Sequence, residues 1–184
     1  MKPEDIAAFV RANIEPLPRA GPRYSVAAKL TDGTSLPCVV VESVTHVVDL
    51  AMRRFEEERL REIKSNSGLT GGYRKIVEAF VAAGNRVNYY EIESLQKSDF
   101  AIPLARLGEI KGETSMGWTE FYGTMKDGAE FRFGTTFHEE FFEMPQGYSA
   151  TDIQMIVPAV RSEEPRYEKV FREKPFFICY IEGL

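Results

Sequence analysis

A glutamate flanked by aromatic residues is the first candidate for chemistry in this sequence. Glu120 lies two residues after Trp118 and two before Tyr122, so the three side chains share one face if the segment is a strand. A carboxylate among aromatic rings is desolvated, which favours its protonated form and suits a general acid. The alternatives are a hairpin end open to water or an arginine that pairs with Glu120. Glu120 is therefore a candidate acid, and Trp118 and Tyr122 are candidate ligand contacts.

The two histidines are weaker candidates for acid–base chemistry. His46 lies three residues before Asp49, so one helical turn would bring the two side chains together and orient the imidazole as a base. The alternative is that Thr45 caps this helix and Asp49 only occupies its first turn. His138 follows Arg132, a candidate ligand contact, on the polar face of a predicted strand. The alternative for His138 is an ordinary half-exposed histidine at a strand end.

A glycine-rich segment before a predicted helix suggests an anion site. Gly71 and Gly72 precede Arg74, so backbone N–H groups at a helix start and a guanidinium could face a phosphate or a carboxylate. The segment lacks the G-K-[ST] sequence of a phosphate-binding loop. The alternative is a turn between two helices whose backbone needs positive φ.

No metal or cofactor site is predicted. His138 and Glu139 begin a zinc-helix pattern, but Phe142 stands where the second histidine must be. The chain has only two histidines and two cysteines, which leaves few ligands for zinc. Cys38 and Cys179 lie in apolar runs, which predicts two buried thiols, with one disulfide as the alternative.

The composition indicates a soluble protein without a nucleic-acid or membrane surface. The 184 residues carry a formal net charge of -5, which disfavours binding to phosphates or to an anionic membrane. The first residues lack a signal-peptide core, and the apolar runs are far shorter than the ~20 residues that cross a bilayer. We therefore expect a cytoplasmic location and a protein partner or a second copy of the chain, with no nucleic acid and no membrane.

Two Asp-Gly pairs predict the hairpins that must position these residues. Asp127-Gly128 separates residues 118–125 from 129–138, and Asp32-Gly33 separates residues 24–31 from 34–42. We expect two-residue loops, because the type I′ turn needs positive φ at both central positions. Pro37 lacks an N–H group, so its strand should have an edge or a bulge there.

The loop length determines which residues face each other. In the second hairpin a two-residue loop places Tyr122 opposite Phe133, and the face that carries Glu120 becomes an aromatic core. Arg132 and His138 then lie on the opposite face. In the first hairpin the same rule places Tyr24 opposite Val41 and Val26 opposite Val39.

The remaining segments complete the predicted fold. Residue patterns predict helices over 3–14, 45–64 and 73–83 and strands over 86–93, 153–157 and 176–181. The last strand is apolar throughout, which is typical of burial on both faces. Residues 100–110 fit either a short helix opened by Pro103 or an edge strand.

The sequence thus predicts a single α+β domain over residues 1–184. An antiparallel β-sheet is expected from the two hairpins and a C-terminal buried strand, with about three α-helices packed on it. Residues 1–22 form a helix and a proline-rich connector, 23–93 a hairpin with two helices and a strand, and 94–184 an aromatic-rich β region. No known family pattern is found in the sequence.

Two functions fit these observations. The first is a non-enzymatic binding or protein-interaction domain, because no catalytic, metal or cofactor set is complete and aromatic residues commonly anchor interfaces. The second is a small hydrolase or lyase that uses Glu120 as a general acid or base. We favour the first hypothesis, and the sequence leaves open whether the protein is an enzyme.

Overall fold

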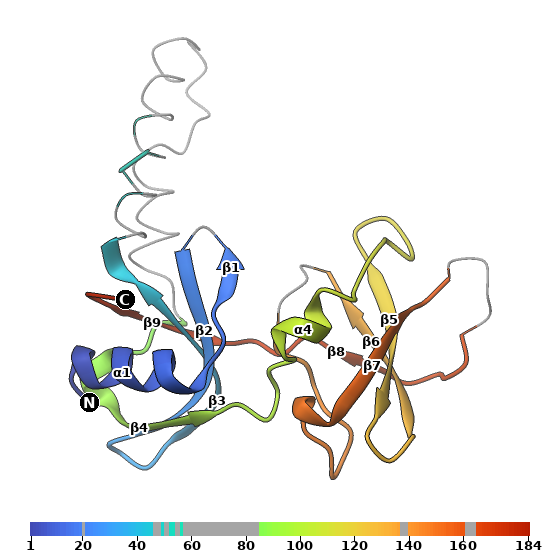
Figure 1. Ribbon diagram of the computed structural model, residues 1–184, viewed down its shortest axis with the longest axis horizontal. Coiled ribbons are helices and arrows are strands. Elements are labelled where there is room, and N and C mark those ends of the chain that lie inside the picture. The colour runs from blue at the N-terminus through green and yellow to red at the C-terminus, as the bar shows by residue number, and fades with distance from the viewer. Residues whose placement is uncertain are drawn as a thin grey trace.

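The computed structural model describes residues 1–19, 21–45, 49, 52–53, 56, 85–136, 140–160 and 165–184. Two β-sheets lie side by side along the long axis of the molecule, and both termini lie at the first sheet (Figure 1). The first sheet contains β1 (Leu17–Arg19), β2 (Gly21–Leu30), β3 (Ser35–Ser43), β4 (Ile92–Lys97) and β9 (Phe177–Ile181). The second contains β5 (Thr119–Met125), β6 (Glu130–Thr135), β7 (Ile153–Pro158) and β8 (Val170–Arg172).

Helix α1 (Pro3–Asn13) covers one face of the first sheet. Proline at the start of the helix and acidic residues in its first turn favour helix initiation at this point. The fully buried Ile6 and Val10 of α1 belong to one hydrophobic cluster with Val26 of β2 and Val39 of β3. The helix predicted over 3–14 is therefore confirmed.

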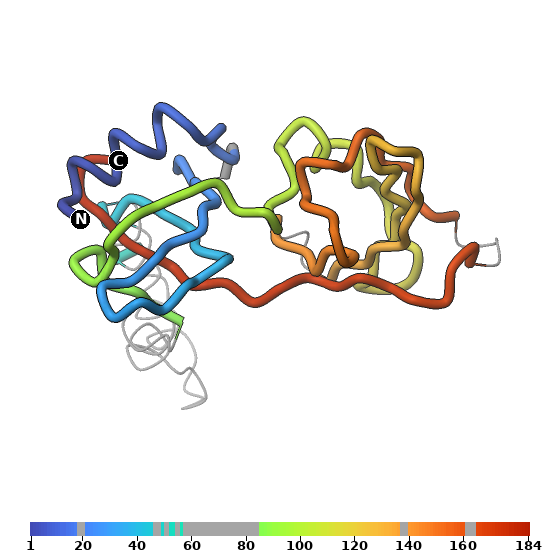
Figure 2. The backbone as a smooth tube through the Cα atoms, turned by 90° about the horizontal axis from the view of Figure 1, so that it is seen from below, coloured from blue at the N-terminus to red at the C-terminus, as the bar shows by residue number. Residues whose placement is uncertain are grey.

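The second sheet has the strand order β7-β5-β6-β8 and is strongly curled (Figure 2). Its core is aromatic: the rings of Phe121 and Phe133 stack with 5.3 Å between their centroids. Phe142 packs edge-on against both rings. The short helix α4 (Leu104–Leu107) lies beside this core, to which Leu107 contributes a partly buried side chain.

The turn of the second hairpin is one residue longer than predicted. Gly128 has a φ of +88°, and its N–H donates to the carbonyl oxygen of Met125 at 2.9 Å. The Met125 N–H donates to the Ala129 carbonyl oxygen at 2.7 Å, so three residues form the loop. This pattern is that of a turn followed by a glycine bulge, and the Asp32-Gly33 turn has it too. The predicted two-residue loops are wrong.

The extra loop residue shifts the second hairpin by one position. Phe121 instead of Tyr122 faces Phe133, and Tyr122 faces Arg132. Because side chains alternate along a strand, Phe121 and Phe133 enter the core while Glu120, Tyr122 and Arg132 share the opposite face. We call this second face of the sheet the outer face. The predicted aromatic core around Glu120 is therefore wrong.

The first hairpin keeps its predicted register because a bulge compensates for the longer loop. Val26 faces Val39 as predicted, but nearer the turn Ala28 faces Leu36. Two residues of β3, at positions 37 and 38, therefore lie opposite one residue of β2. Position 37 is the proline at which a bulge or an edge was expected, and this prediction is confirmed.

The predicted fold class needs correction. A single antiparallel sheet is wrong, because the structure has two mixed sheets with one parallel pair each, β3–β9 and β6–β8. The C-terminal strand β9 is not buried on both faces, since Cys179 and Ile181 on one face are buried while Ile178 and Tyr180 on the other are only half-buried. Part of the proline-rich connector forms β1, which pairs with the start of β2.

Other predicted elements have different outcomes. The strand predicted over 86–93 is wrong, because a 3-10 helix (Tyr89–Glu91) precedes β4. The strand predicted over 153–157 is confirmed as β7, and the alternative of a short helix after Pro103 is confirmed as α4. Of the helix predicted over 45–64, positions 45, 49, 52, 53 and 56 are described and helical. The rest of it, like the helix predicted over 73–83, lies outside the described residues.

Distant segments of the chain pair where the two sheets meet. The Ile102 N–H donates to the Glu140 carbonyl oxygen at 2.9 Å, and the Lys174 N–H donates to the Phe141 carbonyl oxygen at 2.9 Å. Phe141 is fully buried here and belongs to one apolar cluster with Val40 of β3. The predicted single domain stays a prediction. In the described part of the chain, no helix is long and apolar enough to cross a membrane.

Candidate functional site

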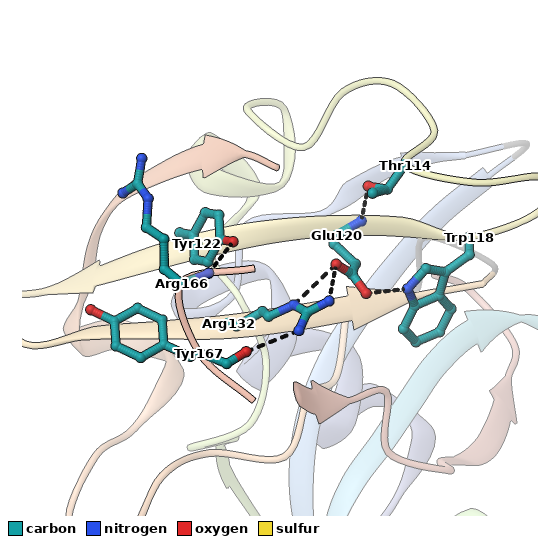
Figure 3. Close-up of polar contacts among 7 residues, drawn as sticks. All are labelled: Thr114, Trp118, Glu120, Tyr122, Arg132, Arg166 and Tyr167. Carbon is teal, nitrogen blue, oxygen red and sulfur yellow. Dashed lines mark hydrogen bonds and ion pairs between the residues drawn. The ribbon is translucent and has the colours of Figure 1, made fainter. Parts of the chain in front are cut away.

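The outer face brings together four of the residues selected from the sequence (Figure 3). One carboxylate oxygen of Glu120 accepts hydrogen bonds from Nε and Nη2 of Arg132, at 3.0 and 2.6 Å. The other oxygen accepts from the indole Nε1 of Trp118 at 2.7 Å. The Glu120 and Arg132 side chains are each only 12% exposed, so this ion pair is largely shielded from water. Tyr122 is the next residue of β5 on the same face.

The same side chains hold the segment that leads into β8 against the sheet. Arg132 Nη1 donates to the Tyr167 carbonyl oxygen at 2.9 Å, and the Arg166 N–H donates to the Tyr122 hydroxyl oxygen at 3.2 Å. The Arg166 guanidinium also lies over the Tyr122 ring, 4.9 Å from its centroid. The segment is thus fixed by polar contacts on both strands of the hairpin, as Figure 3 shows.

Trp118 covers a glycine of the neighbouring strand. A Cβ atom at Gly134 would lie 2.1 Å from the Trp118 ring, so only glycine leaves room for the indole. The Arg172 guanidinium also lies over the indole, 5.2 Å from its centroid. Trp118 is therefore held in one orientation, with its N–H directed at Glu120.

This arrangement bears on the expected role of Glu120. Of the alternatives considered, pairing with an arginine is the one observed, and both carboxylate oxygens accept hydrogen bonds from protein groups. A general acid needs a carboxyl group that can carry a proton and reach a substrate. Arg132 and Trp118 instead occupy both oxygens of Glu120, so neither oxygen is open to a substrate. The geometry suits a structural clasp between β5, β6 and the segment before β8.

The other candidates lie outside the described residues. These are His46, His138, Gly71, Gly72 and Arg74, and their proposed roles stay predictions. Asp49, the proposed partner of His46, is described and lies exposed on a helix.

A second polar cluster, which the sequence did not indicate, is buried where the two sheets meet. Glu140 is 1% exposed, and its Oε1 accepts hydrogen bonds from Nε of Arg23 at 3.1 Å and from Oγ of Ser25 at 2.9 Å. Arg23 also lies 3.5 Å from a carboxylate oxygen of Glu42. Oε2 of Glu140 has no hydrogen-bond partner among the described residues. Buried carboxylate oxygens are normally satisfied, so this atom marks an unusual site.

A pocket of about 240 Å³ lies beside this cluster. Its walls come from the end of α1, from β1 and β2, and from the segment that links β4 to α4. Ser25 lines the pocket and at the same time donates to Glu140, so it connects the pocket with the buried carboxylate. The lining is mainly apolar, with Glu15 and Lys97 as its charged residues.

The cysteines and carboxylates offer no further reactive centre in the described part of the chain. Both cysteines are free and buried, so the prediction of two buried thiols is confirmed. Burial raises the pKa of the Cys38 thiol to about 11 and that of Cys179 to about 12. Neither thiol is therefore a thiolate near neutral pH. Among the described residues, no group of three or more His, Cys, Asp or Glu side chains is placed to hold a metal ion.

The sequence offered little indication of the buried cluster. Glu140 and Arg23 are 117 positions apart, and their pairing depends on how the two sheets meet. The one local sign is that Glu140 directly precedes Phe141 and Phe142, both fully buried. Because a fully buried glutamate is almost always paired, this position indicates a buried partner only once the burial of Glu140 is known.

Comparison with known proteins adds no family to this description. No family model, no curated protein and no solved structure matches the chain. The class that the fold and the site define is a protein of two mixed β-sheets with a buried ion pair between them and a polar clasp on the outer face.

Replacing Glu120 with glutamine tests the structural role of the clasp. We expect Glu120→Gln to lower the free energy of unfolding by about 1–3 kcal/mol, because it removes charge-assisted hydrogen bonds to a shielded arginine. Urea denaturation measures the change. The control is Glu130→Gln, since Glu130 pairs with the 53% exposed Arg166 and its loss should cost at most about 1 kcal/mol. Unchanged or increased stability of Glu120→Gln would contradict the clasp.

Proposed function

We propose that this chain is a non-enzymatic protein-interaction domain whose contact surface is the outer face of the second sheet. The observation that carries the proposal is the fixed cluster of aromatic and arginine side chains around Glu120 (Figure 3). Tryptophan, tyrosine and arginine are the residues that most often dominate binding energy at interfaces. Side chains that are already ordered lose little conformational entropy when a partner binds.

Exposed apolar side chains around the cluster support the same proposal. Tyr167 is 41% exposed at the edge of the clasp, and its ring lies 6.2 Å from that of Tyr122. Met155 of β7 is 49% exposed and faces Thr124, which belongs to the outer face. Met116 is 96% exposed in the turn just before Trp118. Methionine and aromatic side chains are enriched at protein interfaces relative to other surfaces.

The alternative is a small hydrolase or lyase with Glu120 as its acid or base. The occupied oxygens of Glu120 favour the interaction domain, because a substrate would have to displace Arg132 or Trp118. A protein partner also fits the net charge of -5 better than nucleic acid does. We further propose a cytoplasmic location, which the two free cysteines support because disulfides are rare in that compartment.

Quantitative capture from an extract of the source organism tests the proposal. The baits are the wild type, the double variant Met116→Ser/Tyr167→Ala and the control Tyr90→Ala, whose exposed aromatic side chain lies outside the second sheet. We expect a partner that the wild type and the control retain and the double variant loses. Circular dichroism and thermal melts should show that all three are folded equally well.

Two results would refute the proposal or change the partner. Equal capture by all three baits, or capture by none together with a monomeric wild type, would exclude the outer face as a contact surface. Light scattering during gel filtration examines the other expected partner, a second copy of the chain. A dimer that only the double variant loses would identify homodimerisation as the interaction.

A further inference from the structure

The pocket beside Ser25 lies in a gap along the edge of β2. β1 pairs with Gly21–Arg23 and β4 pairs with Val26–Leu30, so Tyr24 and Ser25 lie between the two pairing partners. Residues from the end of α1 and from the segment before α4 complete the pocket lining. The volume of about 240 Å³ corresponds to roughly eight water molecules at ~30 Å³ each. A small ligand therefore fits.

The floor of the pocket selects ligands that donate hydrogen bonds. A serine hydroxyl has one proton and two lone pairs, and the proton of Ser25 is donated to Glu140 Oε1. Only lone pairs remain for a ligand, so the ligand atom that meets Ser25 must carry a proton. A hydroxyl that donates to a carboxylate is also a stronger acceptor, because hydrogen bonds in a chain polarise one another.

The charges behind the floor favour a cation as this donor. Glu140 and Glu42 share one guanidinium, that of Arg23, and the second oxygen of Glu140 receives no hydrogen bond from the described residues. Lys174, which also lies at this junction, places its ammonium group over the Phe100 ring. Because the Glu140 side chain is buried, its field is screened less than that of a surface carboxylate. The two charged lining residues, Glu15 and Lys97, are opposite in sign and offset each other. A cation at Ser25 therefore gains from the carboxylate behind the hydroxyl.

The walls determine the rest of the ligand. The pocket has apolar walls beside Ser25, formed by Ile14, Leu17, Ile102, Pro103 and Leu104. An ammonium group on a short hydrocarbon chain matches both surfaces, since the chain is buried against the walls while the head reaches Ser25. Catalysis by Ser25 is not favoured, because the Glu140 oxygen that accepts its hydrogen bond is already occupied by a hydrogen bond from Arg23.

We propose that this pocket is a binding site for a primary ammonium group on a short apolar chain. The group has two sources, a free alkylamine or the side chain of a lysine in another protein. The proposal is independent of the outer face and would stand if that surface had no partner.

Titration calorimetry with n-butylammonium tests the proposal on the full chain. We expect n-butylammonium to bind, and 1-butanol and butyrate to bind at least about tenfold more weakly. 1-Butanol lacks the positive charge, and butyrate lacks the hydrogen-bond donor. We expect Ser25→Ala to weaken n-butylammonium binding about tenfold to a hundredfold, the effect of losing one hydrogen bond to a charged group. The matched control is Ser43→Ala, a serine as buried as Ser25 that lies outside the pocket lining.

A second variant separates loss of the pocket from loss of stability. Thr151→Phe narrows the pocket at an exposed lining residue without touching Glu140, and it should weaken binding while the fold remains intact. Equal binding of butanol, no effect of Ser25→Ala, or an equal effect of Ser43→Ala would overturn the proposal. A comparison with Nα-acetyl-lysine methylamide identifies the source: tighter binding of that compound indicates a lysine side chain, and tighter binding of n-butylammonium indicates a free amine.

Discussion

Replacing Glu140 with alanine is expected to lower the free energy of unfolding by about 3 kcal/mol or more, because it leaves a buried arginine without its main partner. The Arg23 side chain is 11% exposed, and its contact with a carboxylate oxygen of Glu42 is longer, at 3.5 Å. Ser25 loses its acceptor in the same variant. Urea denaturation with tryptophan fluorescence measures the change, since the chain contains a single tryptophan.

A control and a double variant make this prediction specific. Glu42→Ala should cost about 1 kcal/mol or less, because the Glu42 side chain is 20% exposed and its contact with Arg23 is longer. Arg23→Met/Glu140→Leu should recover much of the loss, since apolar residues often replace a buried ion pair at little cost. A loss below about 1 kcal/mol in Glu140→Ala would contradict the burial of this pair between the sheets.

Phe121→Ala is expected to lower the free energy of unfolding by about 3–5 kcal/mol, the usual cost of removing a buried aromatic ring. Phe121 is fully buried, and its ring contacts those of Phe133 and Phe142. The missing ring would leave a cavity at the centre of the aromatic core of the second sheet. Chemical denaturation measures the loss, and Tyr167→Ala, at an exposed tyrosine, should cost about 1 kcal/mol or less.

The same variant discriminates between the two registers of the hairpin. With a two-residue loop, Phe121 would lie opposite Gly134 on the face away from the aromatic core, and its removal would cost little. With the observed three-residue loop it faces Phe133 inside the core. If Phe121→Ala lowers the free energy of unfolding by much less than the loss of a typical core phenylalanine does, the shorter loop is favoured.

The two Asp-Gly turns illustrate how far local sequence could predict this fold. The hairpins themselves were predictable, because glycine at positive φ and alternating apolar residues are local properties. The loop length was not, because Asp-Gly suits both a two-residue turn and a three-residue turn with a glycine bulge. One added residue moved Glu120, Tyr122 and Trp118 from the predicted core to the outer face.

The candidate site was predictable only in part. Four of its residues were selected from the sequence, but Arg132 was assigned to one face of the hairpin and Trp118, Glu120 and Tyr122 to the other. Their partnership with Arg166 and Tyr167 depends on a crossover segment with no local signal of its own. The pocket at Ser25 was not predictable at all, since its walls come from α1, β1, β2 and the segment before α4.

Features that depend on contacts between neighbouring residues could be predicted from the sequence. It specified the helix predicted over 3–14 and observed over Pro3–Asn13, the existence of both hairpins, the bulge at Pro37 and the apolar surroundings of the two thiols. The tertiary structure decided the division into two mixed sheets, the parallel pairs that β8 and β9 form, and the meeting of Glu140 with Arg23. These features join residues far apart in the chain, and their free energy comes from burial and charge pairing that exist only after the sheets have formed.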